Sequence, residues 1–255
     1  SRWYSGAGIF RPVYLFERNK AHFTTDGICF SAKRSESGYT AKITSETVGT
    51  DETYSVRHRI YDGDVTVAEA CGSHSVSVTA ECPNVTEWDI DCPKLYTLQS
   101  ELIKNETVID SQERRIGFRT TEFTPDGFFL NGRKLKMNGV CLHHDLGCLG
   151  AAVNKTATKR QLTLMKEMGA NAVRTSHNMP SCELMDLCDE LGILVDSEAF
   201  DMWELKKTEF DYARFFDDRY KMDVESWVKR DRNHPSVIMW SIGNEIYDTH
   251  VSEHG

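Results

Sequence analysis

The 255-residue sequence lacks several features that define whole classes of protein. It has no apolar run near the roughly 20 residues that a membrane-spanning helix needs. It has no excess of positive charge, since its formal net charge is −9 at pH 7, and nucleic-acid phosphates would repel such a chain. The Gly-x-Gly-x-x-Gly fingerprint of dinucleotide-binding folds is absent too. These absences argue against a membrane or a nucleic-acid partner, whereas a neutral small-molecule substrate is compatible with the charge.

The cysteines show no pattern typical of a metal site or a redox motif. There are eight, and no two form a Cys-x-x-Cys pair. We expect scattered buried thiols rather than disulfides. The chain also opens abruptly, inside a segment (1–10) that already looks structured, so we expect it to be a piece of a longer protein.

Residues 17–123 have the pattern of a β-sandwich. Short runs with period-two alternation of apolar and polar residues follow one another, separated by turn signals such as Ser37-Gly38 and Asp62-Gly63. The predicted strands are 27–32, 39–44, 54–61, 75–79, 95–102 and 113–118. Several short strands over about 100 residues are typical of an antiparallel, immunoglobulin-like sandwich.

Residues 124–255 have a different pattern. A tight hairpin is predicted at 128–135, where Asn131-Gly132 supplies the positive φ angles of the turn. Four strand-like runs then alternate with three helical patterns, which implies a parallel sheet covered by helices. The predicted strands are 135–142, 172–175, 193–195 and 237–242, and the predicted helices are 158–168, 182–191 and 217–231.

Polar side chains follow each of these four predicted strands. They are His143-His144-Asp145, Arg174 to Asn178, Asp196 to Glu198 with Asp201 and Trp203, and Asn244-Glu245. In α/β barrels the loops after the strands converge on one mouth, where the chemistry takes place. An acidic residue directly after an apolar strand has little structural reason to be there, so we interpret Glu245 as a catalytic proton donor.

Some of these residues also have structural interpretations. His143 and His144 could be a surface pair or ligands of a structural metal. Arg174 could pair with a carboxylate on the neighbouring strand, and one residue can serve both roles. Trp203 could pack its own loop rather than bind a sugar.

Taken together, these segments resemble glycoside hydrolase family 2, and most closely its bacterial β-galactosidase branch. The segments are 139–145, 174–178, 197–201 with Trp203, 243–245, and 117–119 with the upstream Trp88 and 95–98. Residues 1–16 look like the last strand of that family's jelly-roll sugar-binding domain. The resemblance implies that an immunoglobulin-like sandwich follows at 17–123, and that 124–255 form the N-terminal half, strands 1–4, of a (β/α)8 TIM-barrel catalytic domain.

The resemblance implies a retaining glycosidase that cleaves terminal β-galactosides by double displacement. Glu245 would be the general acid/base, Asn244 would hydrogen-bond the sugar 2-hydroxyl, and Arg174 would orient the catalytic carboxylates. The other expected substrate contacts are His143, His177 and Trp203. This chemistry needs a second carboxylate about 5–5.5 Å from the first. In the family that nucleophile ends strand seven of the barrel, so we expect it to lie outside this chain.

Two departures from the family pattern bear on the sugar. Cys141-Leu142 stand where Asn-Arg is usual, and Met179 replaces a frequent proline. Within the family, a β-glucuronidase or a β-mannosidase is an alternative. Outside the enzyme class, a non-catalytic sugar-binding or structural fragment is another.

The resemblance also bears on cofactors, assembly and compartment. Some relatives hold a magnesium ion near the acid/base, and Asp201 or Glu198 could supply oxygen ligands to Mg²⁺. We expect the full-length parent to form a homo-oligomer. The sequence leaves open whether that parent resides in the bacterial cytoplasm or the periplasm.

Overall fold

The computed structural model describes residues 8–250. The chain divides into two compact units. The first comprises residues 14–135 and 229–235, and the second comprises residues 1–13, 136–228 and 236–255.

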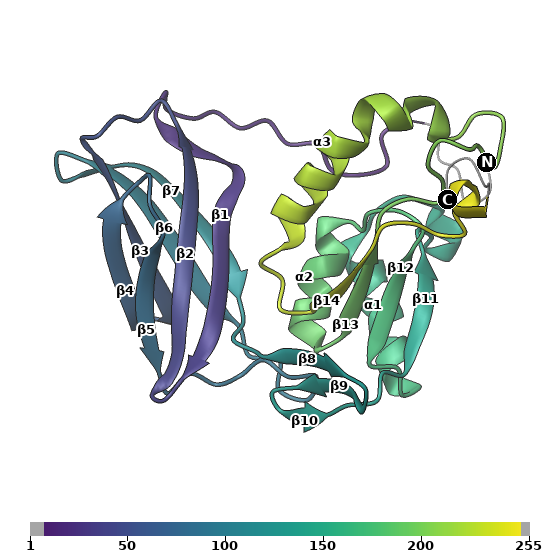
Figure 1. The fold of residues 1–255 in the computed structure, drawn as a ribbon, viewed down its shortest axis with the longest axis horizontal. Coiled ribbons are helices and arrows are strands. Elements are labelled where there is room, and N and C mark those ends of the chain that lie inside the picture. The colour runs from purple at the N-terminus through teal and green to yellow at the C-terminus, as the bar shows by residue number, and fades with distance from the viewer. Residues whose placement is uncertain (1–7, 251–255) are drawn as a thin grey trace. The chain divides into compact units, whose positions relative to one another are not determined.

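The first unit contains a sandwich of two antiparallel sheets (Figure 1). One sheet has the order β1-β2-β5, with β1 at His22–Ser35, β2 at Gly38–Val48 and β5 at Val78–Pro83. The other has the order β4-β3-β6-β7, with β3 at Tyr54–Asp62, β4 at Val65–Ser73, β6 at Tyr96–Lys104 and β7 at Thr107–Ile116. Three strands facing four is the layout predicted for an immunoglobulin-like domain.

Alternate side chains of both sheets meet in one apolar core. Along β6 the buried positions are Tyr96, Leu98, Ser100 and Leu102, which is the period-two pattern that a half-buried strand requires. Phe118 lies at the centre, with its ring 5.2 Å from that of Tyr96 in an edge-on contact. Burial of these rings and aliphatic side chains is the main stabilising term for the sandwich.

Two features of this unit differ from the prediction. Strand β4 was not predicted, because its core-facing residues Ala68 and Ala70 are too small to give an apolar alternation. The predicted strand 75–79 is wrong over 75–77, because Val76 N donates to Ser73 O in a turn and β5 begins only at Val78.

A small three-stranded sheet completes the first unit. It has the order β10-β9-β8, with β8 at Thr121–Thr124, β9 at Gly127–Leu130 and β10 at Arg133–Lys134. Asn131 and Gly132 connect β9 to β10 with φ angles of 54° and 78°. The predicted Asn-Gly hairpin is therefore confirmed.

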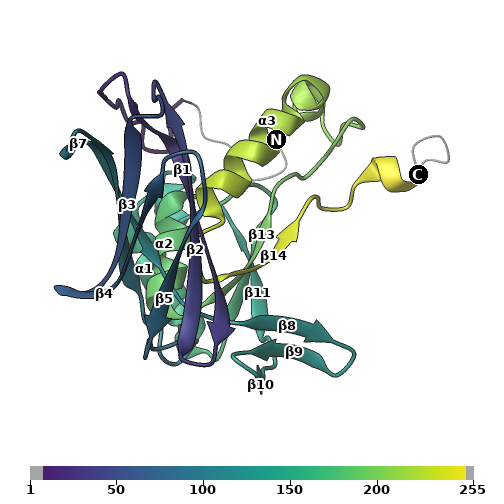
Figure 2. The same cartoon turned by 60° about the vertical axis from the view of Figure 1, so that its left-hand side comes forward.

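The second unit is built on a four-stranded parallel sheet (Figures 1 and 2). Its order is β11-β12-β13-β14, with β11 at Gly139–His143, β12 at Ala172–Ser176, β13 at Leu194–Glu198 and β14 at Val237–Ser241. The helices are α1 at Lys155–Glu167, α2 at Cys182–Leu191 and α3 at Ala213–Asp231, with short 3₁₀ turns η1 at Gly147–Leu149 and η2 at Tyr247–His250. This strand–helix alternation was predicted.

The helix ends follow from local capping. Asn154 and Ser181 precede α1 and α2, and their side chains accept hydrogen bonds from Ala157 N and Leu184 N. Gly192 ends α2 in the left-handed conformation with φ 68°, which glycine adopts without strain. One face of the sheet packs on α1 and α2 through a buried apolar cluster: Leu142, Leu162, Val173, Leu184, Met185, Leu187, Cys188, Ile193, Val195 and Val237.

Residues 8–16 contain no strand, so the described part of the predicted jelly-roll segment lacks the expected element, and residues 1–7 lie outside the described residues. The expectation of buried thiols is wrong for five of the eight free cysteines, which are exposed on loops or outward-facing positions: Cys71, Cys92, Cys141, Cys148 and Cys182. Among residues 8–250, no helix is long and apolar enough to cross a membrane.

Candidate active site

The face of the parallel sheet opposite the helices is polar near the carboxyl ends of its strands. Arg174 on β12, Glu198 on β13 and Ser241 on β14 share this face, as their hydrogen bonds show. Val173 and Val195 point to the opposite face and enter the apolar cluster, because side chains alternate along a strand. The register pairs Cys141 with Arg174 and Glu198 with Ser241. Three consecutive strands thus bring their polar residues together.

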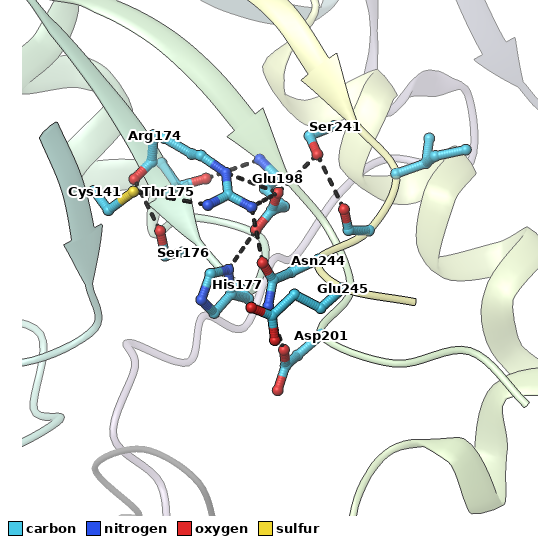
Figure 3. A network of polar contacts seen from close by, with 12 residues as sticks. Cys141, Arg174, Thr175, Ser176, His177, Glu198, Asp201, Ser241, Asn244 and Glu245 are labelled. Atoms are coloured by element: carbon cyan, nitrogen blue, oxygen red, sulfur yellow. Dashed lines mark hydrogen bonds and ion pairs between the residues drawn. The ribbon is translucent and has the colours of Figure 1, made fainter. Parts of the chain in front are cut away.

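Glu198 is the centre of this network (Figure 3). Its side chain is fully buried. One carboxylate oxygen, Oε2, accepts hydrogen bonds from Arg174 Nε at 3.0 Å, Arg174 Nη2 at 2.6 Å and Ser241 Oγ at 2.7 Å. The other, Oε1, accepts from His177 Nδ1 at 2.6 Å. A buried carboxylate that accepts from this many donors is fixed in place, so Glu198 positions its neighbours and is not available to substrate.

Asn244 links this centre to a second carboxylate. Its Oδ1 accepts from Arg174 Nη2 at 3.1 Å, and its Nδ2 donates to Asp201 Oδ1 at 2.8 Å. Both Asn244 and Asp201 are buried. The amide is consequently held in one orientation by a donor on one side and an acceptor on the other.

Glu245 differs from the other two carboxylates. Its side chain is 69% exposed, whereas those of Glu198 and Asp201 are 0% and 4% exposed. Its backbone has φ 46°, a left-handed conformation that non-glycine residues seldom adopt and that is often found at functional sites. Figure 3 shows its carboxylate beside Asn244 and Asp201. Glu245 is therefore the carboxylate of this network that an external molecule can reach.

The predicted histidines have different surroundings. The rings of His143 and His177 lie 5.1 Å apart in an edge-on contact. Burial, and then the neighbouring His177, lower the pKa of His143, so its ring is neutral at neutral pH. His144 Nε2 donates to Asn178 O at 3.1 Å, and burial followed by the nearby Arg11 lowers the pKa of His144 to about 4. His143 is thus placed beside the network, while His144 holds a neighbouring loop.

Trp203 takes part in packing of its own loop. Its Nε1 donates to Ile242 O at 2.9 Å, and its ring stacks on Phe216 with the centroids 6.2 Å apart. These contacts match the structural interpretation of this residue. Its role as a sugar contact stays a prediction.

Sequence reasoning missed one residue of the network. Lys207 lies in the loop between β13 and α3, and its Nζ donates to Asp201 Oδ1 at 3.0 Å and to Asn244 O at 2.7 Å. A lysine in a polar loop has the sequence signature of an exposed residue, so no local pattern marks it. Its burial becomes visible only when the loop is folded over the end of β14.

The residues proposed as magnesium ligands do not fit that role. The described residues contain no group of three or more His, Cys, Asp or Glu side chains arranged to hold a metal ion. Glu198 is surrounded by donors from Arg174, His177 and Ser241, and Asp201 by donors from two further residues. A hard cation needs about six to eight oxygen ligands or water positions, whereas both Glu198 oxygens and Asp201 Oδ1 already accept hydrogen bonds from these donors.

A groove of about 620 Å³ lies beside the network. Ser176 and Asp201 line its polar side, while Phe200, Phe210 and Tyr212 contribute to its apolar side. A volume of this size accommodates a small ligand. An exposed glutamate, an oriented amide and neutral imidazole at the carboxyl ends of parallel strands are typical of a hydrolase that uses a carboxyl group to transfer protons.

Comparison with known proteins identifies the class. The model of the "Glycosyl hydrolases family 2, TIM barrel domain" matches residues 122–254, and that of "Glycosyl hydrolases family 2" matches residues 19–119. The chain belongs to glycoside hydrolase family 2. It is similar to bacterial β-galactosidases of that family, so the resemblance inferred from the sequence motifs is confirmed.

Individual relatives support this family assignment. The β-galactosidase BoGH2A of Bacteroides ovatus is 44% identical, over 97% of this chain and 31% of the relative. A putative β-glucuronidase of Formosa agariphila is 37% identical, over 97% of this chain and 24% of the relative. A crystal structure of a family 2 member from Bacteroides cellulosilyticus has a TM-score of 0.93 at 40% identity, covering 99% of this chain and 34% of that one. The chain spans about a quarter to a third of these proteins.

Proposed function

We propose that this chain forms part of a retaining β-galactosidase in which Glu245 is the general acid/base. The observation that carries the proposal is the exposure of the Glu245 carboxylate, next to an amide whose orientation is fixed on both sides. A proton donor must reach the glycosidic oxygen of the substrate, and Glu198 and Asp201 are buried among donors.

We give the other residues the roles that the family resemblance implies. In the first step Glu245 protonates the departing oxygen, and in the second it accepts a proton from water. Asn244 contacts the sugar hydroxyl next to the anomeric carbon, and His143 and His177 line the sugar pocket. The guanidinium group of Arg174 holds the side chains of Glu198 and Asn244 in fixed positions relative to each other. The nucleophilic carboxylate comes from a later strand of a (β/α)8 barrel of which β11–β14 are the first half, and the whole protein is a homo-oligomer.

The substrate class is the least constrained part of the proposal. A relative named β-galactosidase has the higher identity, and one named putative β-glucuronidase follows, so β-glucuronide hydrolysis is the second candidate. Parallel assays of the full-length protein on aryl β-galactosides and aryl β-glucuronides decide between them. Sugar binding without turnover of either would favour the non-catalytic alternative.

The decisive test is Glu245→Gln in the full-length protein that contains this chain. The amide keeps the shape of the side chain but cannot donate an acidic proton, so kcat/KM falls by about 10²–10⁴ on an aryl glycoside with a poor leaving group. A substrate with a strongly acidic phenol as leaving group needs no protonation and loses much less in the first step.

The matched control is Glu209→Gln, the same change at an exposed glutamate in the loop before α3. It is expected to retain the wild-type rates. Equal kcat/KM for Glu245→Gln and the wild type on the poor leaving group would remove Glu245 from the mechanism. An NMR assignment of the first-formed anomer tests retention.

A further inference from the structure

A buried lysine lies directly beneath the proposed acid/base. The side chain of Lys207 is 1% exposed. Its ammonium group lies 3.0 Å from Asp201 Oδ1, 2.7 Å from Asn244 O and 4.0 Å from Glu245 Oε2. On a further side it lies 5.4 Å from the centre of the Tyr247 ring. Lys207 therefore touches the residues on both sides of the peptide bond that leads into Glu245.

Such an arrangement is costly to fold. Removing an ammonium ion from water costs several kcal/mol, and a buried ion pair seldom gains more stability than apolar side chains of the same volume. A methionine would fill the same space without this cost. The position of Lys207 is thus poorly explained by stability and better explained by what its charge contacts.

Lys207 contacts both the side chain of Asn244, indirectly, and its backbone, directly. Through Asp201 it reaches the side chain of Asn244, because the same Oδ1 atom accepts from both Lys207 Nζ and Asn244 Nδ2. Through its own hydrogen bond it holds the carbonyl oxygen of Asn244. The amide group and the backbone of one residue are thereby fixed by one cation, immediately before the left-handed backbone of Glu245.

We propose that Lys207 is the positioning residue of the acid/base, a built-in cation that fixes the segment 244–245 so that the Glu245 carboxylate faces the substrate. Its ammonium group occupies the space among Asp201, the Asn244 carbonyl and Glu245. The inference rests on the proposed function of Glu245 and adds the group that holds it.

The first test compares Lys207→Met with Lys206→Met in the full-length protein. The two changes remove the same charge from adjacent residues, but Lys206 is exposed. Misplacement of a general acid matters most when the leaving group must be protonated. Lys207→Met is therefore expected to lose about 100-fold in kcat/KM on an aryl glycoside with a poor leaving group and about tenfold or less on an activated one. Lys206→Met should match the wild type on both.

Lys207→Met leaves Asp201 as a buried charge and could fail to fold for that reason. The double variant Lys207→Met/Asp201→Asn removes both charges and keeps an acceptor for Asn244 Nδ2. It still lacks the donor to the Asn244 carbonyl, so the same dependence on the leaving group is expected. Equal losses on both substrates, or none, would overturn the positioning role.

A second measurement does not depend on activity. Hydrogen exchange of the full-length protein, followed in peptides that cover 239–247, should be faster in the double variant than in Lys206→Met by about tenfold at the amides next to residue 244. Unchanged exchange would refute the inference even if the protein hydrolysed no glycoside. If the wild-type protein hydrolysed no glycoside but exchange were still faster in the double variant, the positioning role of Lys207 would be supported. Only the proposed glycosidase function would then be refuted.

Discussion

At the scale of single residues, exposure separates three carboxylates that share one network. Glu198 accepts from three side chains and is fully buried, Asp201 accepts from an ammonium and an amide, and Glu245 is largely exposed. The first two are held in place by the groups that donate to them. The third is the carboxylate that a substrate can reach from solvent.

The Arg174–Glu198 pair gives a stability prediction. Arg174→Met leaves a fully buried carboxylate with His177 and Ser241 as its remaining partners, so unfolding of the 255-residue chain should become easier by about 2–4 kcal/mol. The exposed pair Arg133–Asp89, at 2.9 Å with Arg133 54% exposed, is the matched control. Arg133→Met should cost about 0.5 kcal/mol or less.

Urea unfolding of both variants, followed by circular dichroism, measures these free energies. Similar losses for the two arginines would contradict the assignment of Glu198 as a buried ion held by Arg174.

Much of this site could be predicted from the sequence, because the predicted strand 237–242 ends shortly before Asn244-Glu245 and β12 contains Arg174. The end of a strand fixes the edge of the sheet at which the following residues lie. Lys207 could not be predicted, since its position depends on how the loop of residues 199–212, between β13 and α3, folds over the end of β14. Whether Trp203 packs in its own loop, as it does on Phe216, or contacts a sugar could not be decided from the sequence for the same reason.

At the scale of elements, strand β3 contains a histidine in the middle of an apolar core. His58 is 1% exposed, its Nδ1 lies 2.8 Å from Ser100 Oγ on the neighbouring β6, and its Nε2 has no partner among the described residues. Burial lowers the pKa of His58 from 6.5 to about 4. The folded sandwich therefore holds this ring neutral in a range where the unfolded chain protonates it.

This difference predicts a loss of stability in mild acid. Between pH 6.5 and about 4 the unfolded chain binds a proton at His58 that the folded chain does not, so the free energy of unfolding decreases as the pH falls. From pH 7 to pH 5 the contribution is about 2 kcal/mol. His58→Phe combined with Ser100→Ala removes the titrating group and its hydroxyl partner, and should reduce the pH dependence by that amount.

Thermal or urea unfolding of the chain at the two pH values measures this effect as a difference between variant and wild type. Ser100→Ala alone retains His58 and is expected to keep the full dependence. The prediction does not hold if the double variant and the wild type lose equal stability between pH 7 and pH 5.

The elements themselves were predictable where the pattern was strong. Helix α2 has a serine cap, an apolar face and a terminal glycine, and its bounds agree with the prediction at both ends. Strand β4 was missed because alanine and glycine carry little hydrophobic signal, although pairing with β3 determines its conformation. An element can thus be predicted well when its own residues, such as caps and an apolar face, determine the backbone conformation. It is predicted poorly when pairing with a neighbouring strand determines it.

At the scale of the whole molecule, the parallel sheet has two outer strands. In the order β11-β12-β13-β14, each end strand pairs on one side only among residues 8–250. Unpaired backbone groups on an outer strand favour association with another chain. Apolar side chains add to this at β14, where Trp240 is 38% exposed and Ile242, directly after the strand, is 60% exposed.

We therefore expect the 255-residue chain, prepared by itself, to self-associate through β14. We also expect it to hydrolyse no glycoside, since the proposed mechanism takes its second carboxylate from a later strand. Sedimentation velocity over a range of concentrations measures the association. Ile242→Lys places a charge beside this edge and should shift the equilibrium toward monomer, whereas Val65→Lys, an equally exposed apolar position on the sandwich, should not. A monomeric chain that turns over an aryl galactoside would show that these residues complete an active site by themselves, and the division of catalytic roles proposed for Glu245 and a later carboxylate would have to be abandoned.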